Sequence, residues 1–425
     1  MLLIVRIMIF YLMIKIYNIM DYTLLIGCTG FIGKCILYYM LKFTKNHIFL
    51  VIRAKNNLSV DNRLQIILNN IKLNNYKNIK NRITLVEVEY LKENNMEILF
   101  LNKDDKIKII NNVNCIINGL ADINFNRPII KATQNNTLTA YNWLNIVKKC
   151  KQKVNYIYIS TCYVNFHLNQ SIINEKIYEK NMNTETINKI MEQKIINEKP
   201  YMNTYCYTKQ LTEIVLKENK DNINLHIIRP SIVCPAYKFP YKGFGEMQTV
   251  NLFYHGIFTG NLPFIYLNKD SNIKSIIPVD FIAKECLSKI NNNNNFTIKH
   301  CSLNKLNLYA DEIINTLYKS KIFQDKNKII NGKKIISFKP IITTNIIYIL
   351  SYIIYYIIIK LLEKKTILSM YKALIYSYKL TNVSYFVKQN KEFYTKEQYK
   401  DIDIISIYQC YLDGDFRHHI QSIKL

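Results

Sequence analysis

The sequence predicts an α/β protein with a Rossmann-type, doubly wound parallel sheet followed by a mainly helical C-terminal domain. First, the short apolar run from Thr23 to Ile26 leads directly into a glycine-rich turn and a helical pattern. Second, short apolar runs alternate with helical or polar segments as far as about residue 280, as βαβ units require. Third, this alternation stops at about Lys326 and a helical pattern follows. We therefore predict one domain over 21–325 and a second over 326–425.

The composition is that of a globular protein in a reducing compartment. The net charge is +26, but Lys, Asn, Ile and Tyr are abundant in all parts of the chain, so a compositional bias explains the charge as well as an anionic partner does. No basic block with interleaved aromatic residues indicates nucleic-acid binding. The ten Cys include no C-x-x-C pair, which favours free thiols. The seven His have no metal-ligand spacing, so no metal is expected.

Two apolar segments raise the question of a membrane. Residues 1–20 are apolar except for Arg6 and Lys15, which is typical of an apolar leader or a membrane anchor; a true start at Met20 is the alternative. The segment from Pro340 to Ile359 has no charged residue over 20 positions, enough to span a bilayer. Its four Tyr and several polar residues favour an interfacial or buried helix instead.

The glycine turn is the first candidate binding site. It has the spacing G-x-x-G-x-x-G and contains three of the ten glycines of the chain within seven residues. Glycines at a strand-to-helix turn let the backbone approach a pyrophosphate, and the helix N-terminus supplies N–H donors and a positive dipole end. We expect the dinucleotide to be held there by Gly27, Thr29, Gly30, Phe31, Ile32 and Gly33.

The second predicted strand, His47 to Arg53, indicates which dinucleotide binds. An Asp or Glu at the end of this strand is usual where the ribose carries a free hydroxyl. Here the chain continues as Arg53-Ala-Lys55, with Arg63 further on. A guanidinium fork fits a 2′-phosphate, so NADPH is predicted in preference to NADH. The alternative is that Arg53 is a solvated strand end.

The remaining elements follow in the order of a doubly wound sheet. A polar stretch over 167–200 is expected to be a loop with a short helix. The fifth strand ends in Ser160-Thr161, and a hydroxyl at the carboxyl end of a parallel strand lies where open α/β sheets bind ligands. The predicted strands are Ile83–Val88, Val113–Asn118, Val154–Ile159 and Asn224–Ile228, and the predicted helix is Ile130–Cys150, which carries Asn136.

A tyrosine and a lysine form the candidate catalytic pair. Tyr205 stands four residues before Lys209, so on a helix both side chains lie on one face. A nearby ammonium stabilises a phenolate, which makes such a pair a proton donor for a carbonyl oxygen. The spacing alone is weak, since the chain has 33 Tyr and a core phenol is the alternative.

In this order, the motifs resemble the extended short-chain dehydrogenase/reductase superfamily and, more narrowly, the alcohol-forming fatty acyl-CoA reductases. The chain departs from the family pattern at Val88-Glu89, Leu120-Ala121 and Asn56-Asn57, which bear on adenine contacts and substrate fit. The resemblance rests on TGFIGK (Thr29–Lys34), VIRAK (Val51–Lys55), NGLADINF (Asn118–Phe125), NNTLTA (Asn135–Ala140), ISTCYVN (Ile159–Asn165), NTYCYTK (Asn203–Lys209), IRPSIV (Ile228–Val233), IPVDF (Ile277–Phe281) and the closing segment Asp401–Ile420.

The resemblance implies NADPH-dependent reduction of a long-chain fatty acyl-CoA to a primary alcohol through an aldehyde. Tyr205 would donate the proton, and Lys209 would lower its pKa and bind the nicotinamide ribose. Thr161, with Ser160 nearby, would stabilise the carbonyl oxygen. Further cofactor contacts are expected from Asn136, Arg229 and Ser231.

The same resemblance implies a separate role for each domain. Residues 21–325 would form the NADP-binding domain with an embedded substrate-binding part, and the helical domain over 326–425 would cover the acyl chain. The protein is then expected at a membrane, facing the cytosol, at the endoplasmic reticulum or the peroxisome.

Two other functions remain open from the sequence. One is another extended reductase, acting on a sterol or a nucleotide-sugar, which would share the glycine turn and the Tyr–Lys pair. The other is a catalytically silent, NADP-binding membrane scaffold. The presence of Thr161, Tyr205 and Lys209 together argues against the scaffold.

Overall fold

The computed structural model describes most of residues 21–303 and shorter stretches of the remainder. Residues 1–20 lie outside the described part, as does the apolar segment Pro340–Ile359 except for β17 (Ile341–Ile342). The structure describes residues 21–55, 57–73, 79–91, 96–125, 127–165, 167–168, 172–179, 181–193, 203–246, 264–265, 272–273, 275–303, 308–309, 316, 319, 329–330, 333–334, 341–342, 392–393 and 402–416.

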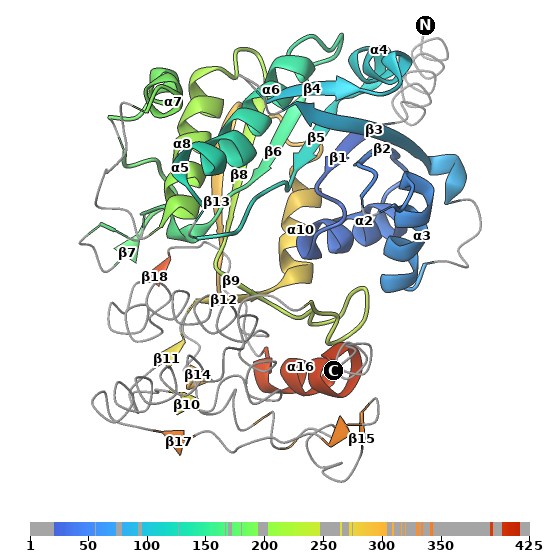
Figure 1. The fold of residues 1–425 in the computed structure, drawn as a ribbon, viewed down its shortest axis with the longest axis vertical. Helices are drawn as coiled ribbons and strands as arrows, with labels where there is room; N and C mark the ends of the chain where they lie inside the picture. Colours follow the sequence, from blue (N-terminus) through green and yellow to red (C-terminus); the bar gives the residue numbers. More distant parts are fainter. Residues whose placement is uncertain are drawn as a thin grey trace, which may run out of the picture.

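An eight-stranded sheet forms the centre of the molecule, in the order β13-β8-β6-β5-β1-β2-β3-β4 (Figure 1). The strands are parallel except for β4, which pairs antiparallel with β3 at one edge. The chain runs outward from β1 to β3 and then returns to β5 on the other side of β1, so the switch point lies between β1 and β5. The strands are β1 (Tyr22–Ile26), β2 (His47–Ile52), β3 (Ile83–Leu91), β4 (Glu97–Phe100), β5 (Cys115–Asn118), β6 (Asn155–Ile159), β8 (Asn224–Pro230) and β13 (Phe296–Cys301).

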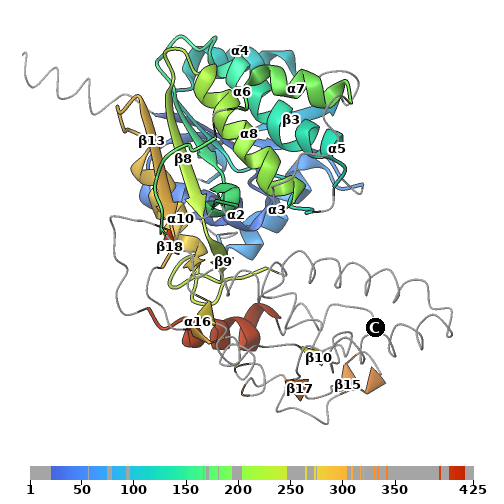
Figure 2. The same ribbon diagram turned by 90° about the vertical axis from the view of Figure 1, so that its left-hand side faces the viewer.

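Helices cover both faces of this sheet, as Figure 2 shows. The helices α2, α3 and α10 pack on one face, and α4, α6 and α8 pack on the other with α5 and α7 beside them. This arrangement confirms the predicted doubly wound α/β fold. The helical segments are α2 (Phe31–Phe43), α3 (Val60–Asn70), η1 (Lys80–Arg82), α4 (Lys103–Asn112), α5 (Ile129–Thr133), the π-helical turn η2 (Gln134–Leu138), α6 (Thr139–Val147), η3 (Cys162–Asn165), α7 (Thr184–Met191), α8 (Thr204–Glu218) and α10 (Val279–Ser288).

Burial on both faces explains the unbroken apolar runs of the central strands. All residues of β5, β6 and β8 are buried, because each of these strands lies between neighbours and under helices. Edge strands are different: β4 alternates between exposed and buried residues, and β13 carries Lys299 and His300. Neither strand was predicted, because neither has a continuous apolar run.

Short strand pairs complete the described structure outside the large sheet. The pair of β9 and β12 continues from the carboxyl end of β8. These short strands are β7 (Ile172–Ile173), β9 (Ile232–Cys234), β10 (Phe264–Ile265), β11 (Asn272–Ile273), β12 (Ile276–Pro278), β14 (Leu308–Tyr309), β15 (Ile329–Ile330), β16 (Lys333–Lys334), β17 and β18 (Glu392–Phe393).

The described part of the C-terminal region includes one helical segment that packs on the Rossmann domain. It consists of α16 (Ile404–Tyr411) and the π-helical turn η4 (Leu412–Phe416). Figures 1 and 2 place it beyond the carboxyl end of the sheet, and its residues Ile407, Tyr408 and Leu412 belong to the same buried cluster as α2 and α10. Most of the region predicted to be helical lies outside the described residues. Within the described residues, no helix combines the length and apolarity needed to cross a membrane.

Candidate active site

The glycine turn follows β1 at the switch point, and two of its glycines are required by sterics. Gly27 has φ +87°, and a Cβ there would come within 2.8 Å of the backbone of Gly119 and Leu120 in the loop after β5. A Cβ on Gly33 would lie 2.1 Å from the carbonyl oxygen of Gly27. Gly30 instead caps α2 without a side-chain hydrogen bond. The turn is thus closely packed, and no side chain caps the N-terminus of α2. This leaves its backbone N–H groups available to a pyrophosphate.

The predicted cofactor residues around the glycines have different surroundings. Phe31 is buried, and its ring packs against Phe244 with centroids 5.6 Å apart. Thr29 and Ile32 are partly exposed on the turn and the first turn of α2. These positions allow backbone N–H groups of this segment to reach an anion.

Arg53 and Lys55 lie just beyond the end of β2, and Arg63 of α3 contacts this segment. Arg53 is exposed, and its guanidinium carbon lies 5.7 Å from the centre of the Tyr90 ring. Arg63, on α3, donates to the backbone carbonyl of Arg53. Lys55 and Leu58 form an isolated bridge that folds the chain between β2 and α3. The structure therefore places Arg63 against the Arg53 backbone, with Lys55 two residues further along the chain, and their contacts with a cofactor stay predictions.

The charge of Arg63 also reaches the glycine turn. Burial raises the pKa of the Cys28 thiol to about 12, while the positive charges of Arg63 and Lys34 act in the opposite direction. The positive charge of Arg63 therefore acts on the glycine turn.

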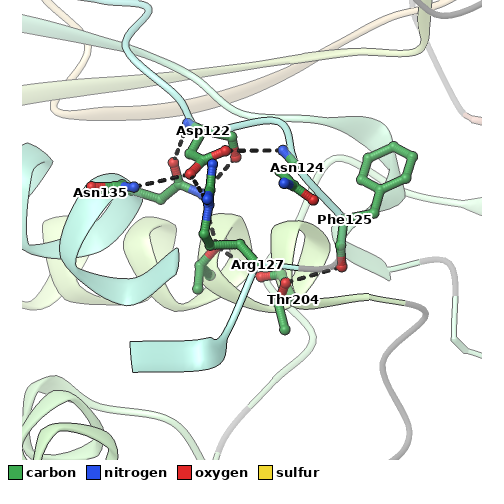
Figure 3. Close-up of polar contacts among 8 residues, drawn as sticks. Asp122, Asn124, Phe125, Arg127, Asn135 and Thr204 are labelled. Carbon is green, nitrogen blue, oxygen red and sulfur yellow. Dashed lines mark hydrogen bonds and ion pairs between the residues drawn. The ribbon is translucent and has the colours of Figure 1, made fainter. Parts of the chain in front are cut away.

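The Asp122 carboxylate holds the loop after β5 in place. The Asp122 carboxylate accepts hydrogen bonds from Arg127 Nε at 2.6 Å, from Asn135 Nδ2 at 2.9 Å and from the Asn124 backbone N–H at 3.1 Å (Figure 3). Burial alone would raise the pKa of Asp122, but the hydrogen bonds outweigh it and hold the pKa below its ordinary value. This loop is therefore rigidly held on the side of the switch point that faces α8.

The same loop is tied to the helix that carries Tyr205. The Asn136 amide accepts from the Asp122 backbone N–H at 2.7 Å and donates to the Asp122 carbonyl at 3.2 Å and the Thr208 hydroxyl at 3.0 Å. Thr204 Oγ1 donates to the Phe125 carbonyl at 3.1 Å (Figure 3). Asn136 lies in η2 and is 1% exposed, so its side chain positions the loop and α8, and the predicted cofactor contact remains untested.

Tyr205 lies in the first turn of α8, whose N-cap is Asn203. The Asn203 side chain accepts from the Cys206 backbone N–H at 2.8 Å, which fixes the start of the helix. The Tyr205 ring contacts the Phe125 ring, with centroids 5.7 Å apart. Burial raises the pKa of the Tyr205 phenol above its ordinary value. This direction is opposite to the shift predicted from Lys209.

The position of Lys209 explains why the predicted lowering is not seen. Its ammonium donates to the Ile159 carbonyl at the end of β6 at 2.6 Å and lies 4.5 Å from the centre of the Tyr158 ring. Burial lowers the pKa of Lys209 to about 7, although the charge of Glu213 acts in the opposite direction. The structure confirms that the pair shares α8, and it directs the ammonium to the end of β6 where Ser160 and Thr161 follow.

The hydroxyls that follow β6 differ in their hydrogen bonding. Thr161 Oγ1 donates to the Pro230 carbonyl at 3.4 Å and accepts from the Tyr163 backbone N–H at 3.3 Å. Ser160 is 3% exposed, and its Oγ has no hydrogen-bond partner. Since a buried hydroxyl without a partner is costly, Ser160 Oγ is well suited to a ligand oxygen.

Arg229, a predicted cofactor contact, is buried and already has protein partners. It is 0% exposed and forms a bidentate ion pair with Glu213, with Nε to Oε1 at 2.9 Å and Nη2 to Oε2 at 2.5 Å. Nη1 also donates to the Lys176 carbonyl at 3.0 Å. A fully buried guanidinium with these partners is a structural element between α8 and β8. Ser231, the other predicted contact on this strand, is 5% exposed and its Oγ lacks a partner.

The residues present fit a nicotinamide dinucleotide. The glycine cradle has no room for a Cβ at Gly27 or Gly33, and the basic residues follow β2. The sequence did not indicate two positioning residues: Asp122 holds the loop after β5, and Glu213 joins α8 to Arg229 of β8. The acidic residue four positions after Lys209 was a usable signal for Glu213, since it lies on the same helical face. No cluster of metal ligands occurs among the described residues.

The lowered pKa of Lys209 predicts a pH effect on stability. The unfolded lysine has a pKa near 10.5, and the folded one about 7, so the folded state binds fewer protons between these values. Stability from this group therefore rises as the pH increases from about 7 to about 10.5. In the cofactor-free protein, Lys209→Met should therefore have a higher free energy of unfolding than the parent below pH ~7. The difference in free energy between the two proteins should shrink as the pH rises. Denaturant unfolding across this range measures it, and a gap independent of pH would contradict the prediction.

The Rossmann domain of this chain is similar to several known proteins. A family model described as male sterility protein matches residues 25–286. The chain is 26% identical to fatty acyl-CoA reductase wat of Drosophila melanogaster over 62% of this chain and 53% of that protein. It is 24% identical to fatty acyl-CoA reductase 1 of Homo sapiens over 67% of this chain and 58% of that protein. The chain thus spans about half the length of the curated relatives it matches.

Among solved structures, the fold is similar to that of a reductase domain. The terminal R domain of the myxalamid PKS-NRPS biosynthetic pathway matches with a TM-score of 0.66 at 14% identity, covering 96% of this chain and 93% of that domain. At this identity the similarity shows the fold, and it agrees with the sheet and the flanking helices.

Proposed function

This chain belongs to the fatty acyl-CoA reductase family, within the extended short-chain dehydrogenase/reductase superfamily, and on that premise we propose that it uses NADPH to reduce a long-chain fatty acyl-CoA to a primary fatty alcohol. One observation carries the proposal. Helix α8 places Tyr205 and Lys209 on one face and directs the Lys209 ammonium to the carbonyl of Ile159, next to the hydroxyls of Ser160 and Thr161. This arrangement supports a role for these side chains in carbonyl reduction.

In the proposed reaction, NADPH supplies hydride to the carbonyl carbon when it is bound. Tyr205 gives its proton to the oxygen, and its buried phenol is protonated at neutral pH, as a general acid must be. The Lys209 charge would favour the phenolate that forms as the proton leaves, and the ammonium would also bind the nicotinamide ribose. The hydroxyls of a bound ribose would favour the charged form of Lys209, whose pKa is about 7 without them.

The carbonyl oxygen gains negative charge during the reaction, and Thr161 and Ser160 would stabilise it. Ser160 Oγ has a free donor for this purpose, and Thr161 lies beside it in the chain. Two rounds of reduction convert the thioester to the aldehyde, with loss of CoA, and then to the alcohol. The same residues would serve both rounds, since each reduces a carbonyl carbon and protonates an oxygen.

We further propose that the protein works at a membrane, facing the cytosol, where long-chain acyl-CoA and fatty alcohol partition. The net charge of +26 would suit an anionic lipid surface and the phosphates of CoA. The endoplasmic reticulum and the peroxisome are the expected sites. Fractionation of cells that express the protein tests this part: recovery only in the membrane-free fraction contradicts it.

An assay with an acyl-CoA substrate tests the activity. Membranes containing the full chain are supplied with NADPH and palmitoyl-CoA, and mass spectrometry detects hexadecanol. Formation of the alcohol supports the proposal. Release of hexadecanal alone would limit the reaction to its first round, and absence of both products across a range of acyl lengths would contradict it. Activity only on a sterol or a nucleotide-sugar would favour the other extended reductases.

The cofactor preference is tested at Arg53. We expect Arg53→Ala to weaken NADPH binding about tenfold or more and to change NADH binding little, because only NADPH carries the 2′-phosphate that a guanidinium would bind. Fluorescence titration of the purified protein with each cofactor measures both affinities. Lys45→Ala is the matched control, since this exposed lysine precedes β2 and its loss removes one positive charge from the opposite end of the strand. An equal loss for NADPH and NADH in Arg53→Ala refutes the 2′-phosphate contact.

A further inference from the structure

The loop Pro235–Glu246, here called the bridging loop, joins two parts of the molecule that are far apart in sequence. It follows β9 and lies between α2, which begins at the glycine turn, and the C-terminal segment 402–416. Its base is anchored by Asp280 of α10, whose carboxylate accepts from the backbone N–H groups of Tyr237, Lys238 and Phe239 at 2.9, 2.8 and 3.3 Å. The rest of the loop contacts each of the two parts through different residues.

On the side of the cofactor site, the bridging loop contacts the first turn of α2. Glu246 Oε1 accepts from Lys34 Nζ at 2.5 Å, and this ion pair is largely shielded, with side chains 13% and 23% exposed. The Phe244 ring packs on Phe31. Lys34 follows Gly33 directly, so the loop holds the very turn whose N–H groups face the proposed pyrophosphate position.

On the opposite side, the bridging loop is fitted to the C-terminal segment. Asp415 accepts from the Tyr241 hydroxyl at 2.8 and 3.1 Å and from the Gly245 backbone N–H at 3.0 Å. A Cβ on Gly243 would lie 2.6 Å from the Tyr411 backbone N, and a Cβ on Gly245 would lie 2.5 Å from the Tyr411 ring. The two glycines therefore let α16 approach the loop closely, and the Asp415 carboxylate fixes the pairing.

The Tyr241 ring connects the two sides. It packs on Phe244, with centroids 5.5 Å apart, and Phe244 packs in turn on Phe31. A contiguous set of contacts thus runs from Asp415 through Tyr241 and Phe244 to the start of α2. A second route runs along the backbone from Gly245, bonded to Asp415, to Glu246, bonded to Lys34.

We propose that Asp415 is a positioning residue for the cofactor: it holds the bridging loop against the first turn of α2, so that docking of segment 402–416 and dinucleotide binding are coupled. The proposal rests on the proposed use of a nicotinamide dinucleotide at the glycine turn. Asp415 touches the loop, and its effect reaches the cofactor site through Tyr241, Gly245 and Glu246.

Coupling of this kind is reciprocal and has two measurable consequences. If docking of the segment favours cofactor binding, then bound cofactor must favour docking by the same factor. The first turn of α2 would contact the pyrophosphate, which NADPH and NADH share. The affinities for both cofactors should therefore fall together when the contact between Asp415 and the bridging loop is lost. That pattern differs from the one expected of Arg53→Ala.

The experiment compares Asp415→Ala with Asp413→Ala in the full chain. Asp413 accepts from Gln409 within the same segment at 3.0 Å, so its loss perturbs the segment without touching the bridging-loop contact made by Asp415. We expect the Kd for NADPH and for NADH to rise about tenfold in Asp415→Ala and to change less than about twofold in Asp413→Ala. Tyr241→Phe, which removes the hydroxyl partner without altering the segment, should raise both Kd values about threefold. It also keeps the test decisive where Asp415→Ala does not fold.

Hydrogen exchange supplies a second measurement, which would show no effect of cofactor if Asp415 had a purely structural role. NADPH should slow amide exchange across 404–411 in the parent and in Asp413→Ala, and this protection should be lost in Asp415→Ala or reduced in Tyr241→Phe. A combined Asp415→Ala/Glu246→Gln variant should lose less affinity than the sum of the losses in the two single variants. Both substitutions weaken the same connection between segment 402–416 and α2.

The outcomes separate the two proposals. If the parent binds the cofactors and both Asp415→Ala and Tyr241→Phe bind them with the same affinity as the parent, the coupling is overturned. The proposed reductase function is then left intact. An equal rise in Kd for Asp413→Ala and Asp415→Ala also overturns it, since general loosening of the segment would then explain the effect. Absence of binding of either cofactor by the parent counts against the proposed function and the coupling together.

Discussion

Replacing Tyr205 with Phe should lower the turnover of acyl-CoA about a hundred- to ten-thousand-fold, the range expected for loss of a general acid. NADPH binding should remain within about twofold of the parent, since the substitution removes one oxygen and keeps the ring that packs on Phe125. Single-turnover oxidation of NADPH measures the chemical step, and titration with NADPH measures binding separately.

The electrostatics of the site explain why the phenol, and not water, would supply the proton. Burial keeps the pKa of Tyr205 above its ordinary value, so the phenol holds its proton until charge develops on the substrate oxygen. Lys209 lies one helical turn away, and its charged form would favour the phenolate that results. Water cannot replace this preorganised donor efficiently, so residual activity in Tyr205→Phe should be small.

Tyr207→Phe is the matched control. Tyr207 lies two residues away on α8 and packs with Leu211 in a separate apolar cluster, so its hydroxyl is outside the proposed chemistry. Its turnover should stay close to that of the parent. A Tyr205→Phe variant with unimpaired single-turnover rate, or an equal loss in both variants, would refute the proton-donor role.

The fold could be predicted well because its signals are local. Strands β1, β2, β5, β6 and β8 are buried on both sides, so each appears in the sequence as an apolar run with nearly the observed bounds. The edge strands β4 and β13 could not be recognised in this way, because solvent replaces one neighbour and polar residues are tolerated there. The helix expected over Ile130–Cys150 is interrupted by the π-helical turn η2, which no periodicity in the sequence indicates.

The site was predictable where one stretch of chain makes it and unpredictable where distant stretches meet. The glycine turn and the Tyr205–Lys209 spacing belong to single segments, so the sequence alone located them. The direction of the Lys209 ammonium depends on Ile159, 50 residues earlier, which the spacing could not reveal. In the same way Asp415 meets Tyr241 across 174 residues.

Loss of the Arg229 guanidinium is expected to give the second large effect. Arg229→Met should destabilise the protein by about 3–5 kcal/mol, because it leaves the Glu213 carboxylate buried without its partner. Side chains of this pair are 1% and 0% exposed, so solvent cannot take the place of the guanidinium. Denaturant unfolding of the cofactor-free protein measures the loss.

The double variant Glu213→Leu/Arg229→Met separates the ion pair from a cofactor contact. Replacing both charges with apolar side chains removes the uncompensated carboxylate, so the double variant should recover much of the stability lost in Arg229→Met. It should also lower the pKa of Lys209 further, because the Glu213 charge that opposes the effect of burial is gone. Turnover in the folded double variant should then decline at a lower pH than in the parent, with NADPH affinity little changed. If instead Arg229→Met loses less than about 1 kcal/mol of stability while NADPH affinity falls tenfold, the guanidinium binds the cofactor after all.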